Sequence, residues 1–413
     1  MFHPFILNFE KGSDKHGAFS NKFKYTSCTA LSDECTGYAT LARIAIAAAI
    51  VTSDRNVRMM ALNYKSQAYE SLRNSISKNG VQPTEHLLTQ MFSLLSMEVI
   101  GQQHEHAALH ARTLQQLIQR DTDCDIAGDA MDSKLLSSIL WHECLRGAFT
   151  LCRPEFDIEQ LVDHSRFLRI LLAVKDRLTK LGMMPQEPIN GFQEAGLRSH
   201  LLMRLREYRF LARLCHGLQQ FPGSIDEDFM TAFSFRAILT STKLQEIYND
   251  AHDEIRTASQ TKHGEDLIVA YTETATALAA IFWYRAATSH EAVDVAPTTQ
   301  TQMYKVFGTQ KPVLHHLKEA IGYCRTAGGL YEQPRLWLWV MYVGSLAERA
   351  DLHPRCDPEA AIASYFHGEL YGLARKLGIG TWEGLEELLS RFLYARKIGP
   401  MSRALFEGAM SRQ

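Results

Sequence analysis

The segment from Pro334 to Arg349 constrains the fold more than any other part of the chain. Every residue from Leu336 to Val343 is apolar, and two of them are tryptophans. Pro334 suits the first turn of a helix, because the amide hydrogen that proline lacks has no partner there. A helix that is apolar on all sides must be buried on all sides, and this one is far shorter than the ~20 residues of a membrane span. We therefore predict a core helix over residues 334–350, in which Gly344 lets a neighbour approach closely.

The chain from Cys35 onwards repeats the helical period of apolar residues. Thr84 is a good N-cap for a helix over Glu85–Ile100, and a helix over Val57–Ser77 would bury one face, made of Met60, Tyr64, Ala68 and Leu72. Further helices are predicted over Tyr38–Val51, Glu105–Gln119, Lys134–Leu151, Ile158–Leu181, Leu197–Leu218, Phe229–Ser259, Glu265–Ala287, Val313–Ala327, Pro358–Leu377, Trp382–Ala395 and a short stretch from Met401. The segment with Pro185, Pro188 and Gly191 is predicted as a loop. The pattern predicts an all-α fold, an array of antiparallel helical hairpins packed around the helix at 334–350.

Composition and charge narrow the class of protein. Hydrophobic content of 46% and charged content of 22% are typical of a globular chain. We predict an irregular segment over residues 1–34 and a single all-α domain over 35–413, with an internal boundary at 289–302. A formal net charge of −2 gives no general attraction to nucleic acid or to a membrane. The start of the chain lacks a secretion signal, which predicts an intracellular protein with free cysteine thiols.

Two segments contain residues of the kinds that bind metals. His106 and His110 lie four residues apart in a predicted helix, but the zinc-protease pattern that begins at His104 would need its second histidine at Ala108. The stretch from Asp121 to Asp132 spaces its acidic residues like a calcium loop. However, Ile126 stands where the sharp turn needs glycine. We predict no metal and no cofactor; an α-helical, metal-dependent enzyme that uses the Asp121–Asp132 loop stays a less favoured alternative.

Other polar patterns also have a simple structural interpretation. Arg206, Arg209 and Arg213 could meet phosphate or an acidic partner, or form a solvated helix face. Cys215 and His216 are adjacent in a helix and so point in different directions, which excludes a nucleophile and base pair. The aromatic cluster of the core helix could line a ligand pocket or pack in the core; its members are Trp337, Trp339 and Tyr342. No catalytic residues are predicted.

Several segments, taken in order, resemble the regulatory homology region of fungal zinc-cluster transcription factors. The most telling are Pro334–Leu346 and the stretch from Thr381 through Tyr394; the weaker ones are Ala61–Tyr64, Leu87–Glu98 and the segment that begins at His110. The residues of this chain that match the family motifs are Tyr64, His110, Pro334, Trp337, Trp339, Gly344, Trp382 and Phe392. The resemblance implies an all-α regulatory domain located in the nucleus.

The family's DNA-binding module needs six cysteines that hold two zinc ions. Cys28 and Cys35 have one of the required gaps, but no other cysteines complete the set. We therefore expect no direct DNA binding through a zinc cluster in this chain, whether the module was lost or lies upstream of an incomplete gene model.

The resemblance implies a non-catalytic domain that acts through protein partners of the transcription machinery. Binding of a small ligand and self-association are both compatible with it. The alternative is a helical interaction scaffold unrelated to transcription, for which a cytoplasmic location is expected. Neither reading places the chain in a membrane.

Overall fold

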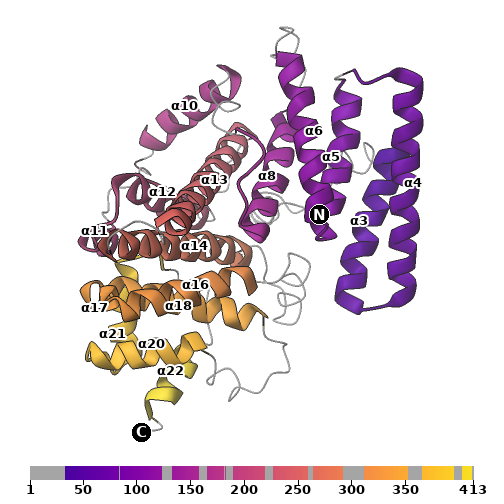
Figure 1. Cartoon of the computed structure of the whole chain (residues 1–413). Coiled ribbons are helices and arrows are strands. Elements are labelled where there is room, and N and C mark those ends of the chain that lie inside the picture. Colours follow the sequence, from indigo (N-terminus) through magenta and orange to yellow (C-terminus); the bar gives the residue numbers. More distant parts are fainter. Residues whose placement is uncertain are drawn as a thin grey trace. The chain divides into compact units, whose positions relative to one another are not determined.

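The computed structural model describes residues 33–82, 84–122, 133–157, 165–180, 182, 189–218, 227–258, 264–291, 311–351, 365–394 and 402–411. Every regular element in these ranges is a helix, and they contain no strand, which confirms the all-α class (Figure 1). The arrangement as antiparallel hairpins around one central helix stays a prediction.

The chain divides into two compact units, which we describe separately. The first contains residues 1–182, 218–239 and 305–308, and the second contains residues 183–217, 240–304 and 309–413. Helix α13 (Glu227–Ala258) begins in the first unit and continues into the second. The boundary predicted at 289–302 lies mostly outside the described residues. These end at Glu291, the last residue of α14 (Gly264–Glu291), and begin again at residue 311.

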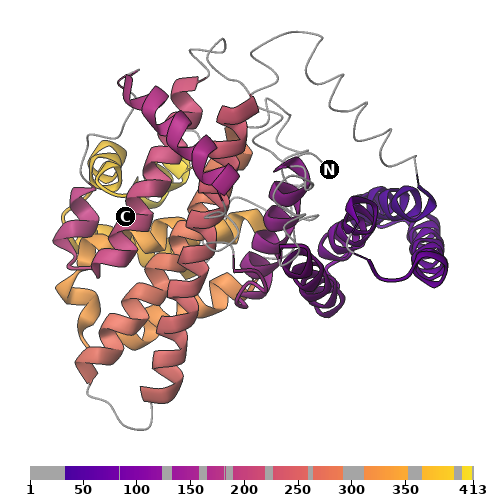
Figure 2. The same cartoon turned by 90° about the horizontal axis from the view of Figure 1, so that it is seen from above.

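The first unit is built from helices that pack on their neighbours in the chain. They are α3 (Glu34–Thr52), α4 (Arg55–Asn79), α5 (Glu85–Ile100), α6 (His104–Thr122), α8 (Ser133–Thr150) and α10 (Ser165–Lys180). Helix α3 contacts both α4 and α5, and α5 contacts α6 and α8. Figure 2 shows α3 and α4, in indigo, nearly end-on beside the helices that follow them. Among the described helices, α4 packs chiefly against α3 alone.

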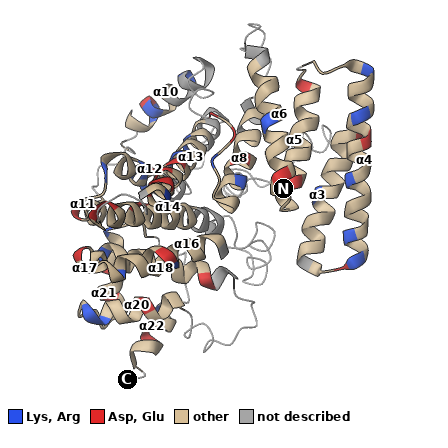
Figure 3. Ribbon diagram, in the orientation of Figure 1, with Lys and Arg blue, Asp and Glu red and all other residues tan. Residues whose placement is uncertain are grey.

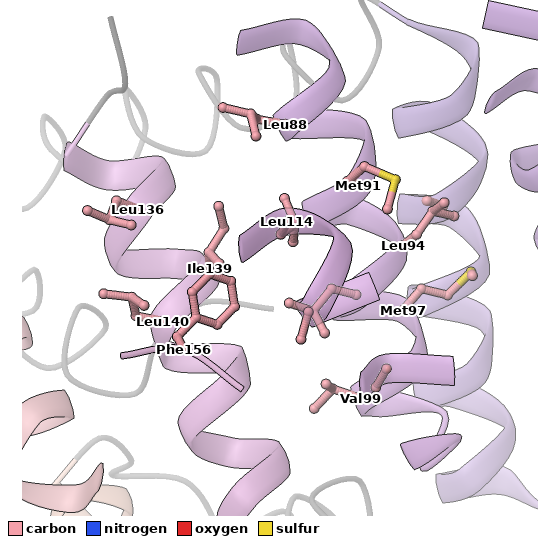
Figure 4. Packing of buried hydrophobic residues seen from close by; sticks show 14 of the residues in the cluster. Leu88, Met91, Leu94, Met97, Val99, Leu114, Leu136, Ile139, Leu140 and Phe156 are labelled. Atoms are coloured by element: carbon pink, nitrogen blue, oxygen red, sulfur yellow. The ribbon is translucent and has the colours of Figure 1, made fainter. Parts of the chain in front are cut away.

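The core of the first unit lies between α5, α6 and α8. Met91 and Leu94 of α5, Leu114 of α6, and Ile139 and Leu140 of α8 belong to one cluster of buried apolar side chains (Figure 4). Burial of one such side chain contributes roughly 1.5–3 kcal/mol relative to leaving it exposed. The apolar periodicity of three successive helices therefore accounts for their packing.

Side-chain caps define where the first helices begin. The carboxylate of Asp33 accepts a hydrogen bond from the Thr36 amide at 2.8 Å, and the Thr84 hydroxyl accepts one from the Leu87 amide at 3.2 Å. Such caps satisfy amide groups that have no partner inside the helix and contribute about 1 kcal/mol each. The helix predicted from Thr84 is confirmed with the same bounds, Glu85–Ile100.

The second unit holds the remaining helices. They are α11 (Asn190–Glu194), α12 (Ser199–Leu218), α14, α16 (Lys311–Thr326), α17 (Gly329–Glu332), α18 (Pro334–Asp351), α20 (Tyr365–Lys376), α21 (Trp382–Ser390) and α22 (Ser402–Ser411), together with the later part of α13. Helix α18 contacts α14, α16 and α20, so it has neighbours on several sides.

The apolar run of helix α18 is buried, as the sequence predicts. Every residue from Leu336 to Glu348 is buried, and the helix begins at Pro334. The position of Gly344 faces the ring of Phe366 on α20, where a Cβ atom would clash with the ring carbons. The Phe366 amide donates to the Glu348 carboxylate at 2.9 Å. Glycine therefore sets how closely α20 approaches α18.

Helix α14 is the other strongly apolar helix of this unit. Its stretch Gly264–Tyr284 is long and apolar enough, by length and composition, to cross a membrane, but 78% of its most apolar window is buried inside the protein. A helix that is apolar on all sides can be a membrane span or a core helix. Because most of this stretch is buried inside the protein, α14 packs as a core helix.

Three sequence predictions of local structure are wrong. The segment around Gly191, predicted as a loop, contains the short helix α11, and the helix predicted over Trp382–Ala395 ends at Ser390. The helical pattern predicts Met60 on the buried face of its helix, but its side chain is 51% exposed. The buried residues of α4 are Ala61, Ala68 and Leu72, because a helix that packs chiefly against one neighbour buries only a narrow stripe.

Candidate functional site

The residues that carry the family resemblance are mostly core residues. Trp337, Trp339, Trp382, Phe392 and His110 are buried, while Pro334 and Tyr64 are half-buried. They lie in both units: Tyr64 and His110 belong to the first, and the others belong to the second. Neither unit contains all of these residues, so they do not form one site within a unit.

The indole of Trp339 lies at the centre of an aromatic cluster in the second unit. Phe192 of α11 packs edge-on against both Trp339 and Phe392, with ring centroids 4.9 Å apart in each case. The Trp339 Nε1–H donates to the Leu393 carbonyl at 2.8 Å. At Gly191 a Cβ atom would lie 2.7 Å from the Phe392 ring. These contacts join α11, α18 and the turn after α21, so Trp339 packs in the core.

A buried carboxylate network joins α4 to α5 and α6 in the first unit. The Glu98 side chain is 1% exposed and accepts from Lys65 Nζ at 2.8 Å and from the Tyr69 hydroxyl. The Tyr69 oxygen also lies 3.0 Å from His110 Nε2. Because the Tyr69 proton goes to the carboxylate, which only accepts, His110 must donate from Nε2. Burial lowers the pKa of His110 and raises that of Tyr69, so both groups are neutral near pH 7.

A second buried ion pair holds the chain after α8. Arg146 donates to both Glu143 carboxylate oxygens, from Nε at 2.9 Å and from a terminal nitrogen at 2.6 Å, and it also donates to the Arg153 carbonyl at 3.2 Å. The Glu155 amide donates to Glu143 at 2.6 Å. Each charged group is thus paired and hydrogen-bonded, as buried charges need to be. The pair fixes the path of residues 151–156.

The two histidines considered for metal binding differ in burial, although both lie close to the Glu98 network: His106 Nδ1 is 4.0 Å from Glu98 Oε1, and His110 Nε2 contacts Tyr69. His106 is exposed, whereas His110 is buried and bonded to Tyr69. Among the side chains that the structure describes, no group of three or more His, Cys, Asp or Glu residues is placed to hold a metal ion. Residues 123–132 of the Asp121–Asp132 loop lie outside the described part of the chain, as do Cys28 and Cys124.

The arginine stripe of α12 also divides. Arg209 donates to the Ser390 carbonyl at 3.2 Å and so connects α12 to the end of α21, while Arg206 is exposed. The side chains of Arg213, Cys215 and His216 lie outside the described residues. A stripe that faces phosphate would keep its arginines free, so Arg209 favours a structural role.

Exposed apolar side chains gather on the first two described helices. We call this set the α3–α4 face; its members are Leu41 (43% exposed), Ile44 (59%), Met59 (57%) and Leu62 (53%). Met60 (51%) is also exposed but points to another side of α4, because residues two apart in a helix do not share a face. Sequence reasoning missed this face, because an apolar residue in a helical period normally predicts burial. The available signal was the spacing of the buried stripe of α4, Ala61, Ala68 and Leu72, which leaves Met59 and Leu62 pointing away.

Comparison of the chain with protein-family models, with curated proteins and with solved structures finds no match in any of the three. The fold and the α3–α4 face define an all-α protein with an exposed apolar surface. The resemblance to the regulatory region of fungal transcription factors stays a prediction.

Proposed function

We propose that this chain is a non-catalytic regulatory domain of a fungal transcription-factor-like protein and that it acts in the nucleus through contacts with other proteins. The observation that carries the proposal is the α3–α4 face, where four large apolar side chains remain exposed on two neighbouring helices. Single exposed apolar residues are common, but a group of them on one pair of elements is typical of an interaction surface.

The buried polar groups support a role without turnover. The Glu98 carboxylate is occupied by Lys65 and Tyr69, and the Glu143 carboxylate by Arg146 and the Glu155 amide. A general base needs a free acceptor within reach of a substrate proton. These carboxylates instead anchor helices and loops, which is the role expected in a rigid scaffold. The transcriptional part of the proposal depends on the resemblance alone.

Tethering tests the proposal directly. The full chain is fused to a foreign DNA-binding domain and expressed in a fungal host with a matched reporter gene. We expect reporter output to change, in either direction, and the change to be weaker when Met59 and Leu62 are both replaced by serine. No change of the reporter with a stably expressed fusion would overturn the transcriptional role.

The same face supports a second candidate, a helical interaction scaffold unrelated to transcription. The apolar surface predicts a partner but not a compartment. The location of the untagged chain separates the two candidates, because a nuclear protein fits the first and a protein confined to the cytoplasm fits the second.

A further inference from the structure

We propose that the α3–α4 face binds an acidic amphipathic helix of a partner protein. This inference rests on the proposed function and deepens it by naming the chemistry of the partner. Two features carry it: Met59 and Leu62 form an exposed apolar spot on one side of α4, and apart from the N-cap Asp54 and Glu70 the charged residues of that helix are positive.

The apolar residues occur as helical neighbours. Leu41 and Ile44 are three residues apart on α3, and Met59 and Leu62 are three residues apart on α4, so each pair forms one continuous apolar spot. A docked amphipathic helix presents its own apolar residues at the same spacing. Methionine side chains are flexible and polarizable, which lets them adapt to the partner's side chains.

The positive charge of α4 favours a partner that carries negative charge. This helix carries Arg55, Arg58, Lys65, Arg73 and Lys78, with Glu70 as its single acidic residue, although the whole chain has a net charge of −2. Figure 3 shows these cations distributed along the length of α4. Lys65 is paired with Glu98. Within the described part of the chain, Arg55, Arg58 and Arg73 have no acidic partner in ion-pair range.

Unpaired arginines beside an apolar spot favour carboxylates on the partner. An acidic helix would complement the positive surface, associate faster and bind less tightly in high salt. Arginine is also well suited to bidentate bonds with carboxylates. The partner therefore combines apolar residues at positions i, i+3 or i+4 with Asp or Glu on the flanks.

Other occupants fit these charges less well. A second copy of the chain, related by a twofold axis, would bring α4 against α4 and so place cations against cations. The chain's own first 32 residues contain four lysines (Lys11, Lys15, Lys22 and Lys24) and two acidic residues (Glu10 and Asp14), so that segment is net positive like α4. An anionic bilayer matches the charge, but a helix that lies on a membrane needs a broad apolar face, and α4 exposes its apolar residues between Asn63, Ser66 and Arg55.

Binding of designed peptides to the full chain tests the inference. The first probe is a fluorescent 18-residue helix with leucines at helical spacing and glutamates on its flanks, long enough to span about five turns. The second keeps the leucines and has lysines in place of glutamates. The third keeps the glutamates and has alanines in place of leucines. We expect the first peptide to bind at least about tenfold more tightly than the other two, with affinity that falls as salt rises.

Variants of the chain locate the binding. Met59→Ser with Leu62→Ser, and separately Arg55→Glu with Arg58→Glu, should each weaken binding of the first peptide by about tenfold or more. The matched control is Met203→Ser on α12, whose side chain is 55% exposed elsewhere in the chain, and it should leave binding unchanged. All five substituted side chains are exposed, so thermal melting should show that each variant stays folded.

Several outcomes would overturn the inference. Equal binding of the acidic and basic peptides would remove the charge argument, and unchanged binding by both double variants would place the site elsewhere. Self-association that the Met59 and Leu62 double variant abolishes would assign the face to a second copy. Binding to vesicles of anionic lipid, but to no peptide, would assign it to a membrane. If the acidic peptide binds but the tethered fusion leaves the reporter unchanged, the binding site is supported and the transcriptional role is wrong. If the reporter changes but the acidic peptide does not bind, the transcriptional role is supported and the acidic helix is the wrong partner.

Discussion

The hydroxyl of Tyr69 on α4 donates to the carboxylate of Glu98 on α5, which is buried between the two helices and α6. Helix α4 buries only two alanines and one leucine. The polar bonds from Lys65 and Tyr69 therefore add to the apolar packing that holds α4 beside α5 and α6. The face that we propose for binding is built on this helix, so the network at Glu98 also supports the binding surface.

Replacing Tyr69 by phenylalanine tests that dependence. The variant loses the donor to Glu98 and leaves His110 Nε2 without its acceptor, which should lower the free energy of unfolding by about 1–3 kcal/mol. Urea unfolding followed by circular dichroism measures the change. The matched control is Tyr64→Phe on the same helix, where the ring stacks on Tyr38, and its effect should stay within about 0.5 kcal/mol. Equal effects of the two variants would contradict the role of the hydroxyl.

The indole of Trp339 should be a large contributor to the stability of the second unit. Trp339→Ala removes a fully buried ring and should cost about 3–5 kcal/mol, a large part of a total margin of about 5–15 kcal/mol. Trp339→Phe keeps an aromatic ring but leaves the Leu393 carbonyl unpaired, so it should cost less, about 1–3 kcal/mol. Thermal melting of both variants gives the order, and a melting temperature equal to that of the parent for Trp339→Ala would show that the ring is not buried.

Gly344→Ala should destabilise the protein although alanine favours helix. The new Cβ atom would clash with the Phe366 ring, and such overpacking costs roughly 1–3 kcal/mol. Gly322→Ala on α16 is the control, because no heavy atom lies within 4 Å of its Cβ position; there the better helix propensity should raise stability by up to about 1 kcal/mol.

Opposite signs for these two substitutions, measured by chemical denaturation, are the expected result. Phe366→Leu in the Gly344→Ala background should recover part of the loss, because a smaller side chain then faces the alanine. A loss of stability in both glycine variants would show that close approach of α20 is not the cause.

His142 should make the stability of the protein depend on pH. Burial lowers the pKa of His142 to about 3, with the nearby Arg43 charge adding to the effect, despite the hydrogen bond to the Ser138 carbonyl. The neutral ring donates from Nδ1 to that carbonyl and accepts at Nε2 from the Ser96 hydroxyl. The unfolded chain protonates near the ordinary value of about 6.5, so this contribution to stability is complete above that pH.

As the pH falls from about 6.5 towards 3, the unfolded chain binds a proton that the folded chain excludes, and stability falls by up to about 1.4 kcal/mol per pH unit. His142→Gln removes the titrating group, so its unfolding free energy should fall less steeply over the same range. Other groups titrate in both proteins, which makes the difference between the two slopes the measurement. Parallel slopes would show that His142 is not held neutral.

The local part of the fold could be predicted from residues close together in the chain. Pro334 and the apolar run after it predict the start and the burial of α18, and Thr84 predicts the start of α5, because caps and helical periods act over a few residues. The helical period of apolar residues recurs along the chain from Cys35 onwards and predicts the all-α class, which the described helices confirm.

Contacts between distant segments decided the rest. The helix at Trp382 ends at Ser390 because the following residues turn to place Phe392 against Phe192 and the Leu393 carbonyl on Trp339, and nothing in residues 382–395 reveals those partners. Met60 and Leu62 are apolar, as buried residues usually are, but they are exposed on α4, which packs chiefly against one other helix. By itself the sequence determined where the long helices lie, since that depends on local periods. Only the tertiary structure decided the short helix α11 and which apolar faces are covered, since both depend on contacts between distant segments.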